Sequence, residues 1–286
     1  MIKVWIEAMR LRTLPVSVAG VIMALGYGKL AHKFNATVWV LCLVFAVLAQ
    51  IASNFANEYY DYRDGLDKPG REGPRRGVTE GDISPRAMLM ATYVTLAAAC
   101  CVGLSLLYWG PWWLVLAGVA IGIGVLAYST GPYPLSRHGL GEVAVMLFFG
   151  VVPVNLTYFV MSGEWSVDVF LGSLSAGLMG ANVLLVNNYR DADADSLVGK
   201  RTLAVIFGRN VASALYLING LVAVALMACV WIHISLWAML APMCYIAVHI
   251  MLWLRIRKLS GAALNPMLGV TAMLMLAYSV VFAALA

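Results

Sequence analysis

The chain has 286 residues, of which 62% are hydrophobic and 12% are charged, and its formal net charge is +5 at pH 7. Soluble domains carry roughly twice this charged fraction, so the charged side chains are too few to cover a globule in water. The mean hydropathy of +0.85 indicates a surface that faces mostly lipid. The basic excess lies in short segments rather than on one extended face, which argues against nucleic acid as a partner.

Nine apolar runs follow one another along the chain, and a bilayer-spanning helix needs roughly 20 such residues. They cover about 14–31, 37–56, 88–108, 112–130, 140–161, 168–188, 210–231, 235–254 and 265–285. We therefore expect an all-α membrane bundle of nine transmembrane helices that forms a single domain over residues 1–286. The first run follows basic residues as a signal peptide does, but no convincing cleavage site follows it, so we expect a retained helix.

The distribution of basic residues predicts the orientation, because lysine and arginine near helix ends stay in the cytoplasm. If the N-terminus is cytoplasmic, 17 of the 19 basic residues lie on the inner side and only Lys29 and Lys33 lie outside. The C-terminus is then external. Two long polar segments, about 61–87 and 189–209, fall on the inner side. We expect the active site there, at the cytoplasmic face of the plasma (inner) membrane.

Two acidic clusters stand where apolar helices should emerge at the inner face. The first extends from Asn57 to Asp67 and the second from Asn187 to Asp195. Side chains three and four positions apart share a helix face, so Glu58 in the first cluster should point elsewhere, as should the alanine-flanked aspartate of the second, Asp193. The spacing predicts one shared face in each cluster, formed by Asn57, Asp61 and Asp64 and by Asn188, Asp191 and Asp195.

Carboxylates aligned on one face repel one another unless a cation lies among them. Oxygen ligands with amide support suit Mg²⁺, which binds one or two carboxylates and completes its shell with water and substrate phosphates. Two facing clusters therefore predict an open site for two Mg²⁺ ions and a diphosphate. The alternative is that both clusters are solvated helix ends, which the near-repeat of Asn, Tyr, Arg and Asp makes less attractive.

Basic residues follow each acidic cluster and can hold the outer oxygens of a phosphate. They are Lys68, Arg71, Arg75 and Arg76 after the first cluster and Lys200 and Arg201 after the second. The alternative, that they anchor the inner face, is equally simple for Arg71 and Arg75 and less favoured for Lys200 and Arg201, which Gly199 and Thr202 bracket as in a motif.

Several motifs resemble the UbiA superfamily of intramembrane aromatic prenyltransferases. The superfamily pattern is seen in Asn57-x-x-x-Asp61, in the second cluster, and in the segment from Gly199 to Val205 that continues it. Glu58 departs from the pattern, which usually has Asp after the first Asn. The segments Arg12-Thr13-Leu14-Pro15, Gly73-Pro74-x-Arg76-Gly77, Gly131-Pro132-Tyr133-Pro134-Leu135 and Gly139-Leu140-Gly141-Glu142 resemble more narrowly the menaquinone branch.

The resemblance implies a Mg²⁺-dependent transfer of a polyprenyl chain from polyprenyl diphosphate to 1,4-dihydroxy-2-naphthoate, with loss of pyrophosphate and CO₂, giving demethylmenaquinone. It implies catalytic roles for Asp61 and Asp191 through the metal ions, and charge stabilisation by Lys200, Arg201 and Arg76. An allylic cation needs a dry pocket with aromatic faces. Candidates for that pocket are Tyr60, Tyr128, Tyr133, Phe148, Phe149 and Tyr158.

The aromatic substrate has candidate ligands between the two clusters in sequence. Arg137 and Asn155 could hold its oxygens, although Arg137 could equally be a charge that sets topology. Glu142 could be a base for a naphthol hydroxyl or a cap at a helix start.

Two other functions are compatible with the same sequence features. Another aromatic acceptor of the same superfamily, such as 4-hydroxybenzoate, homogentisate, or a haem or chlorophyll precursor, would use the same head group chemistry. A divalent-cation transporter would also place carboxylates in a helical bundle, but it should carry them near the bilayer midplane on broken helices.

Overall fold

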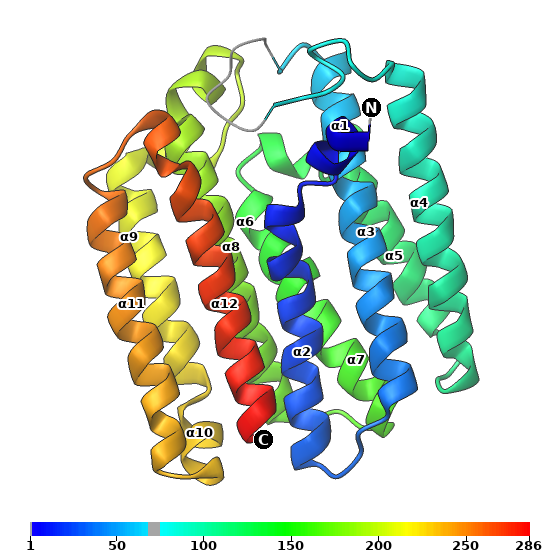
Figure 1. Cartoon of the computed structure of the whole chain (residues 1–286), viewed down its shortest axis with the longest axis vertical. Helices are drawn as coiled ribbons and strands as arrows, with labels where there is room; N and C mark the ends of the chain where they lie inside the picture. Colours follow the sequence, from blue (N-terminus) through cyan, green and yellow to red (C-terminus); the bar gives the residue numbers. More distant parts are fainter. Residues whose placement is uncertain (1, 68–74) are drawn as a thin grey trace.

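The computed structural model describes residues 2–67 and 75–286, and helices make up most of them. The long helices run alongside one another, and the chain begins at one end of the bundle and finishes at the opposite end (Figure 1). The α-helices are α1 (Ile2–Ala8), α2 (Leu14–Leu30), α3 (Ala36–Arg63), α4 (Pro85–Ser105), α5 (Leu114–Ala127), α6 (Gly141–Val145), α7 (Val152–Ser162), α8 (Val167–Leu197), α9 (Leu203–Leu226), α10 (Ala228–Ile234), α11 (Leu240–Ile256) and α12 (Asn265–Leu285).

Within the described residues, eight helical segments are long and apolar enough to cross a membrane. The predicted all-α, multi-pass membrane bundle is therefore confirmed. The run expected at 112–130 is the shorter helix α5, whose 14 residues extend roughly 21 Å at 1.5 Å per residue. That length is less than the roughly 30 Å of hydrocarbon that one span must cross, so the count of nine stays a prediction.

Two helices continue well beyond the apolar runs that predicted them. Helix α3 continues to Arg63 and α8 continues to Leu197, whereas hydropathy ended these runs at 56 and 188. Backbone hydrogen bonds do not require apolar side chains, so a helix persists after it leaves the lipid. Asn57 and Asp61 of the first cluster and all of the second cluster therefore lie on helical backbone.

Helices α6 and α7 are joined by a π-helical segment, η4 (Met146–Val151). Pro153 has no amide hydrogen to donate to the carbonyl of Phe149, which removes one α-helical bond at this point. The segment lies against α8 with almost no space between them, since a Cβ added to Gly150 would be 2.4 Å from Gly177 Cα. This close approach fixes how far the side chains of η4 reach into the bundle.

The run predicted at 210–231 is divided in the structure. Helix α9 begins earlier, at Leu203, has a break at Gly208 (φ 82°) and ends at Leu226, after which α10 begins at Ala228. Hydropathy does not register the break at Met227, because this residue lies among apolar residues, whereas Gly208 lies just before the predicted run and beside Arg209.

Candidate active site

The first acidic cluster lies at the end of α3, on the same side of the bundle as α1 (Figure 1). Asn57 is buried there, and its Oδ1 accepts hydrogen bonds from Arg10 (2.8 Å) and Arg76 (3.2 Å). Its Nδ2 donates to Ser129 Oγ (3.1 Å). Three segments distant in sequence therefore meet at this one amide.

Asp61 lies one helical turn further along α3 and is also buried. Its Oδ2 is 3.7 Å from Arg76 Nη2, and its Oδ1 is 3.6 Å from Arg137 Nη2. Oδ1 accepts no hydrogen bond from the residues that the structure describes. Arg76 also lies 3.0 Å from Asp67 Oδ2, so this guanidinium sits among Asn57, Asp61 and Asp67.

Asp64 directly follows α3 and is held by two arginines. Arg63 donates to its Oδ1 (2.7 Å) and Arg137 donates to its Oδ2 (2.6 Å). These hydrogen bonds, that of Arg63 first, lower the pKa of the Asp64 carboxyl below its ordinary value, while desolvation acts in the opposite direction. Glu58 points away from this group, as predicted, and accepts a hydrogen bond from the backbone amide of Val78 (3.1 Å).

The second cluster is organised around Arg190. This buried guanidinium binds Asp191 through two parallel hydrogen bonds of 2.7 Å, one to each carboxylate oxygen. It also donates to Asn187 Oδ1 (2.8 Å) and to Asn265 Oδ1 at the start of α12 (2.7 Å). No role was predicted for Arg190 from the sequence, although it lies inside the motif of the second cluster, directly before Asp191.

The remaining members of the second cluster have different partners. Asn188 donates to Glu142 Oε1 (2.8 Å), which places the start of α6 against α8. Asp195 is buried with its Oδ1 3.7 Å from Lys200 Nζ. Asp193 points away from the others, as predicted, and its largely exposed carboxylate pairs with Arg209 (3.0 Å).

A loop between α5 and α6 connects the two clusters. Arg137 in this loop reaches Asp61 and Asp64 with its side chain, and its carbonyl oxygen accepts a hydrogen bond from the amide of Arg201 (3.0 Å). Arg201 follows the second cluster. Arg137 therefore connects the first predicted ligand group to the segment that follows the second.

Other predicted residues lie apart from this centre. Tyr133 is in the same loop rather than on a helix, is 55% exposed, and stacks on His138. Asn155 is buried on α7, where it donates to the carbonyl of Val151 (2.8 Å). Arg75 is half-exposed and pairs with Asp82. Lys68, Arg71, Gly73 and Pro74 lie outside the described residues.

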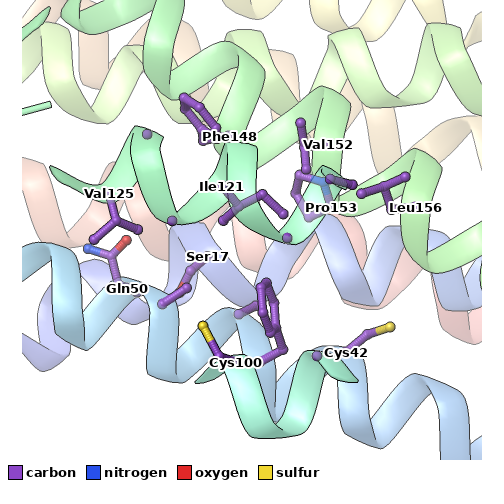
Figure 2. Close-up of a pocket in the computed structure, with 18 of the residues that line it drawn as sticks. Ser17, Cys42, Gln50, Cys100, Ile121, Val125, Phe148, Val152, Pro153 and Leu156 are labelled. Carbon is purple, nitrogen blue, oxygen red and sulfur yellow. The ribbon is translucent and has the colours of Figure 1, made fainter. Parts of the chain in front are cut away.

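Two apolar cavities lie between the helices. The first, of about 390 Å³, is lined by α2, α3, α4, α5, η4 and α7, with Gln50, Tyr128, Phe148 and Phe149 on its wall. Figure 2 shows Gln50 and Val125 on one side of it and Val152, Pro153 and Leu156 on the other. The second, of about 710 Å³, is lined by α5, η4, α7 and the start of α8, including Asn155. Phe148 borders both.

The donor atoms of both clusters fit Mg²⁺. No three carboxylate, histidine or cysteine side chains converge on one point in the described part of the chain, but Mg²⁺ binds one or two carboxylates and takes its other oxygens from water and phosphate. Asp61 Oδ1 is a buried carboxylate oxygen with lone pairs not used in hydrogen bonds. Both oxygens of Asp191 accept from Arg190, and Oδ2 also accepts from Asn187 Nδ2 at 3.4 Å, so the second cluster offers a carboxylate that hydrogen bonds already orient.

Arg10 and Gln50 were missed by sequence reasoning. Arg10 lies 47 positions from its partner Asn57, so no local pattern connects them. Gln50 is a polar residue inside an apolar run, and an intramembrane polar side chain is itself a signal of function.

The membrane bundle holds paired acidic and arginine side chains next to an apolar cavity. Such a site suits a molecule with an ionic head and a lipid tail. Residues 13–275 match the model of the UbiA prenyltransferase family, and the chain belongs to this family. It is 33% identical over 276 residues to the 1,4-dihydroxy-2-naphthoate octaprenyltransferase of Escherichia coli (strain K12), covering 92% of this chain and 88% of that one.

Two further comparisons agree with this assignment. The chain is 35% identical over 215 residues to the 1,4-dihydroxy-2-naphthoate octaprenyltransferase of Haemophilus influenzae, covering 72% of this chain and 70% of that one. Its fold is similar to that of a UbiA homolog from Archaeoglobus fulgidus bound to DMAPP and Mg²⁺, with a TM-score of 0.71, 16% identity and coverage of 98% and 99%.

Proposed function

We propose that this protein transfers a polyprenyl chain from polyprenyl diphosphate to 1,4-dihydroxy-2-naphthoate with release of pyrophosphate and CO₂, giving demethylmenaquinone. The observation that carries the proposal is that Arg137 contacts the carboxylates of the first cluster with its side chain and the segment after the second cluster through its backbone. A site of this kind, next to apolar cavities, suits a substrate with a charged head and a hydrocarbon tail. The relatives named 1,4-dihydroxy-2-naphthoate octaprenyltransferase support this acceptor.

The head of the donor would bind between the clusters. We assign Asn57, Asp61 and Asp64 to one Mg²⁺ ion and Asn188, Asp191 and Asp195 to a second. The bound ions would neutralise the diphosphate and make it a better leaving group.

Arg76 is placed to hold the leaving diphosphate. It is buried beside Asn57 and Asp61, so its charge acts in a medium of low dielectric, where it is worth more than in water. Two further basic residues, which follow the second cluster, would also stabilise the diphosphate charge. They are Lys200, which lies near Asp195, and Arg201, whose amide binds the Arg137 carbonyl.

The tail would lie in the apolar cavities. Each buried methylene contributes roughly 0.8 kcal/mol, so a long chain binds strongly without polar contacts. Phe148 and Phe149 of η4 and Tyr128 at the end of α5 border the first cavity. Their ring faces would stabilise an allylic cation where water is excluded. Tyr158 belongs instead to the packed core, and Tyr60 lies under Arg63.

The acceptor would enter between the loop and α6. A ring carbon attacks the first carbon of the tail as the carbon–oxygen bond to diphosphate breaks, and the ring carboxylate leaves as CO₂. Glu142 has one oxygen bonded to Asn188 and a second, buried oxygen with no hydrogen-bond partner among the described residues, which suits a base for the naphthol hydroxyl. Arg137 would hold the acceptor carboxylate; Asn155 is a second candidate ligand at the far cavity.

The location follows from the same arrangement. The protein is a multi-pass membrane protein. We propose that it lies in the plasma (inner) membrane with both clusters at the cytoplasmic face, the N-terminus cytoplasmic and the C-terminus external. The 17-to-2 division of basic residues supports this orientation.

The test uses purified protein, Mg²⁺ and a long-chain prenyl diphosphate with each acceptor in turn. We expect prenylated product, pyrophosphate and CO₂ with 1,4-dihydroxy-2-naphthoate. Product from 4-hydroxybenzoate, homogentisate or a haem or chlorophyll precursor, and none from dihydroxynaphthoate, would overturn the acceptor. Mg²⁺ flux in vesicles without diphosphate release would instead support a transporter.

A further inference from the structure

Helix α3 carries a polar stripe that continues from the first acidic cluster into the apolar interior. Its members Gln50, Asn54, Asn57 and Asp61 are separated by four, three and four positions, which places them on one helix face. Asn57 and Asp61 belong to the site described above. Gln50 lies seven residues before Asn57, roughly 10 Å deeper along the helix at 1.5 Å per residue.

The hydrogen bonds around Gln50 determine which way its amide faces. The hydroxyl of Thr13 donates to the carbonyl of Arg10 (2.9 Å), so its oxygen is left to accept. Asn54 Nδ2 donates to the carbonyl of Met9 (2.8 Å), so Asn54 Oδ1 is also an acceptor. Gln50 Nε2 lies 3.2 Å from the Thr13 hydroxyl and 3.0 Å from Asn54 Oδ1 and donates to both.

This arrangement leaves the amide oxygen of Gln50 in the cavity wall. Gln50 is 8% exposed and lines the first cavity, and its Oε1 has no hydrogen-bond partner among the described residues. Figure 2 shows this oxygen on the side facing Ile121 and the nitrogen on the far side. The hydroxyl of Ser17, in the same wall, already donates to the carbonyl of Leu14 (2.9 Å).

A buried acceptor without a donor costs free energy, and the substrates differ in what they can offer it. The prenyl tail has no polar hydrogen, and an ionised diphosphate presents only acceptor oxygens. The carboxylate of the aromatic acceptor is also acceptor-only. Its hydroxyl groups are the remaining donors.

We propose that Gln50 Oε1 accepts a hydrogen bond from a ring hydroxyl of the aromatic acceptor and so selects hydroxylated rings. This rests on the proposed function, because it assumes that an aromatic substrate reaches the first cavity. The ring would lie below the diphosphate, between Gln50 and Asn57, where the first carbon of the tail is within reach. Thr13 and Asn54 hold the Gln50 amide in this orientation.

The test measures how strongly each hydroxyl contributes to binding. The two monohydroxy-2-naphthoates, each lacking one hydroxyl, are assayed as competitive inhibitors against 1,4-dihydroxy-2-naphthoate in the wild type and in Gln50→Met, which keeps the side-chain length without the oxygen. In the wild type we expect one analogue to bind about 10- to 100-fold more weakly than the other. In Gln50→Met that difference should fall below about threefold, and the KM for prenyl diphosphate should stay unchanged.

Two variants separate this role from packing. Ser17→Ala alters the same cavity wall and should retain the wild-type difference between the analogues. Gln50→Glu keeps an acceptor oxygen and should retain it as well, and it gives the answer if Gln50→Met does not fold.

The result that would overturn the proposal is a full difference between the analogues in Gln50→Met, or its loss in Gln50→Glu. Equal binding of both analogues to the wild type would also overturn it. If wild-type protein forms no product from dihydroxynaphthoate, the proposed function itself fails, which the assay reports separately.

Discussion

The main-chain amide of Arg201 donates a 3.0 Å hydrogen bond to the carbonyl oxygen of Arg137. The side chain of Arg137 reaches Asp61 and Asp64 of the first acidic cluster. One residue thus contacts the first acidic cluster through its guanidinium and the segment after the second cluster through its backbone. The spacing between the two halves of the site depends on this contact.

Replacing Arg137 should therefore reduce catalysis more than stability. We expect Arg137→Ala to lower kcat/KM by about 100-fold or more, the scale for losing one preorganised donor. Arg137→Lys should recover only part of the loss, since lysine cannot form the forked contact with two carboxylates. Steady-state kinetics in detergent measures both effects. Lys258→Ala, an exposed basic residue after α11, is the control, and equal rates in all three variants would contradict the role of Arg137.

The proposed metal ligands Asp61 and Asp191 should respond differently from Asp193 to the same substitution. Asp61→Ala and Asp191→Ala should each abolish turnover while membrane insertion is intact, because each removes a proposed metal ligand. Asp193→Ala should keep near-wild-type activity, since this carboxylate is largely exposed and pairs with Arg209, away from the proposed ligands. Mg²⁺ titration of activity in each variant is the measurement. Full activity in Asp61→Ala or Asp191→Ala would rule out the two-ion site.

The preference for donors of a given tail length should depend on Phe148. This ring borders both cavities and packs so closely on Gly124 that an added Cβ there would lie 2.3 Å from Phe148 Cζ. Phe148→Ala should join the two cavities and raise kcat/KM for longer prenyl diphosphates relative to shorter ones by roughly tenfold, on the scale of a few buried methylenes. Val125→Ala widens the first cavity alone and should not. Competition between donors of different length tests this, and an unchanged preference would contradict it.

Arg190 should matter for stability. Its guanidinium is buried and binds Asn187, Asp191 and Asn265, which connects α8 to α12. Arg190→Met removes the guanidinium that binds both oxygens of the buried Asp191 carboxylate and should cost about 3 kcal/mol of unfolding free energy. The double variant Arg190→Met with Asp191→Leu should recover part of this loss. Thermal unfolding in detergent gives the comparison, and a wild-type Tm for the single variant would show that the pair is not stabilising.

Helical spacing predicted the directions of several side chains correctly. Positions 57, 61, 188, 191 and 195 are buried in the last turns of α3 and α8, while Glu58 and Asp193 turn away from them. These side chains lie on continuous helix, where a four-residue separation determines a shared face. The same spacing places Gln50 on the face of Asn57 and Asp61. Gln50 was not predicted as a site residue, because it lies inside a run that hydropathy assigned as apolar.

What the sequence could not provide are the contacts between distant segments. The bond from Arg10 to Asn57 and the bridge at Arg137 join residues from separate helices and loops, and no local period encodes them. Tyr133, a candidate for the aromatic pocket, lies in a loop, because it comes after the end of α5 and stands among Gly131, Pro132 and Pro134, which form a turn. The close packing of the π-helical segment on α8 likewise joins Gly150 and Gly177, which are far apart in sequence.

The central claim is that a prenyl group replaces the carboxylate of dihydroxynaphthoate at this site. The most direct measurement follows carboxyl-labelled 1,4-dihydroxy-2-naphthoate with a polyprenyl diphosphate, Mg²⁺ and purified protein, and quantifies labelled CO₂, pyrophosphate and prenylated product in the same reaction. We expect equal amounts of labelled CO₂, pyrophosphate and prenylated product, and none of these products when Mg²⁺ is chelated. Pyrophosphate release without labelled CO₂, or unchanged turnover in excess chelator, would contradict it.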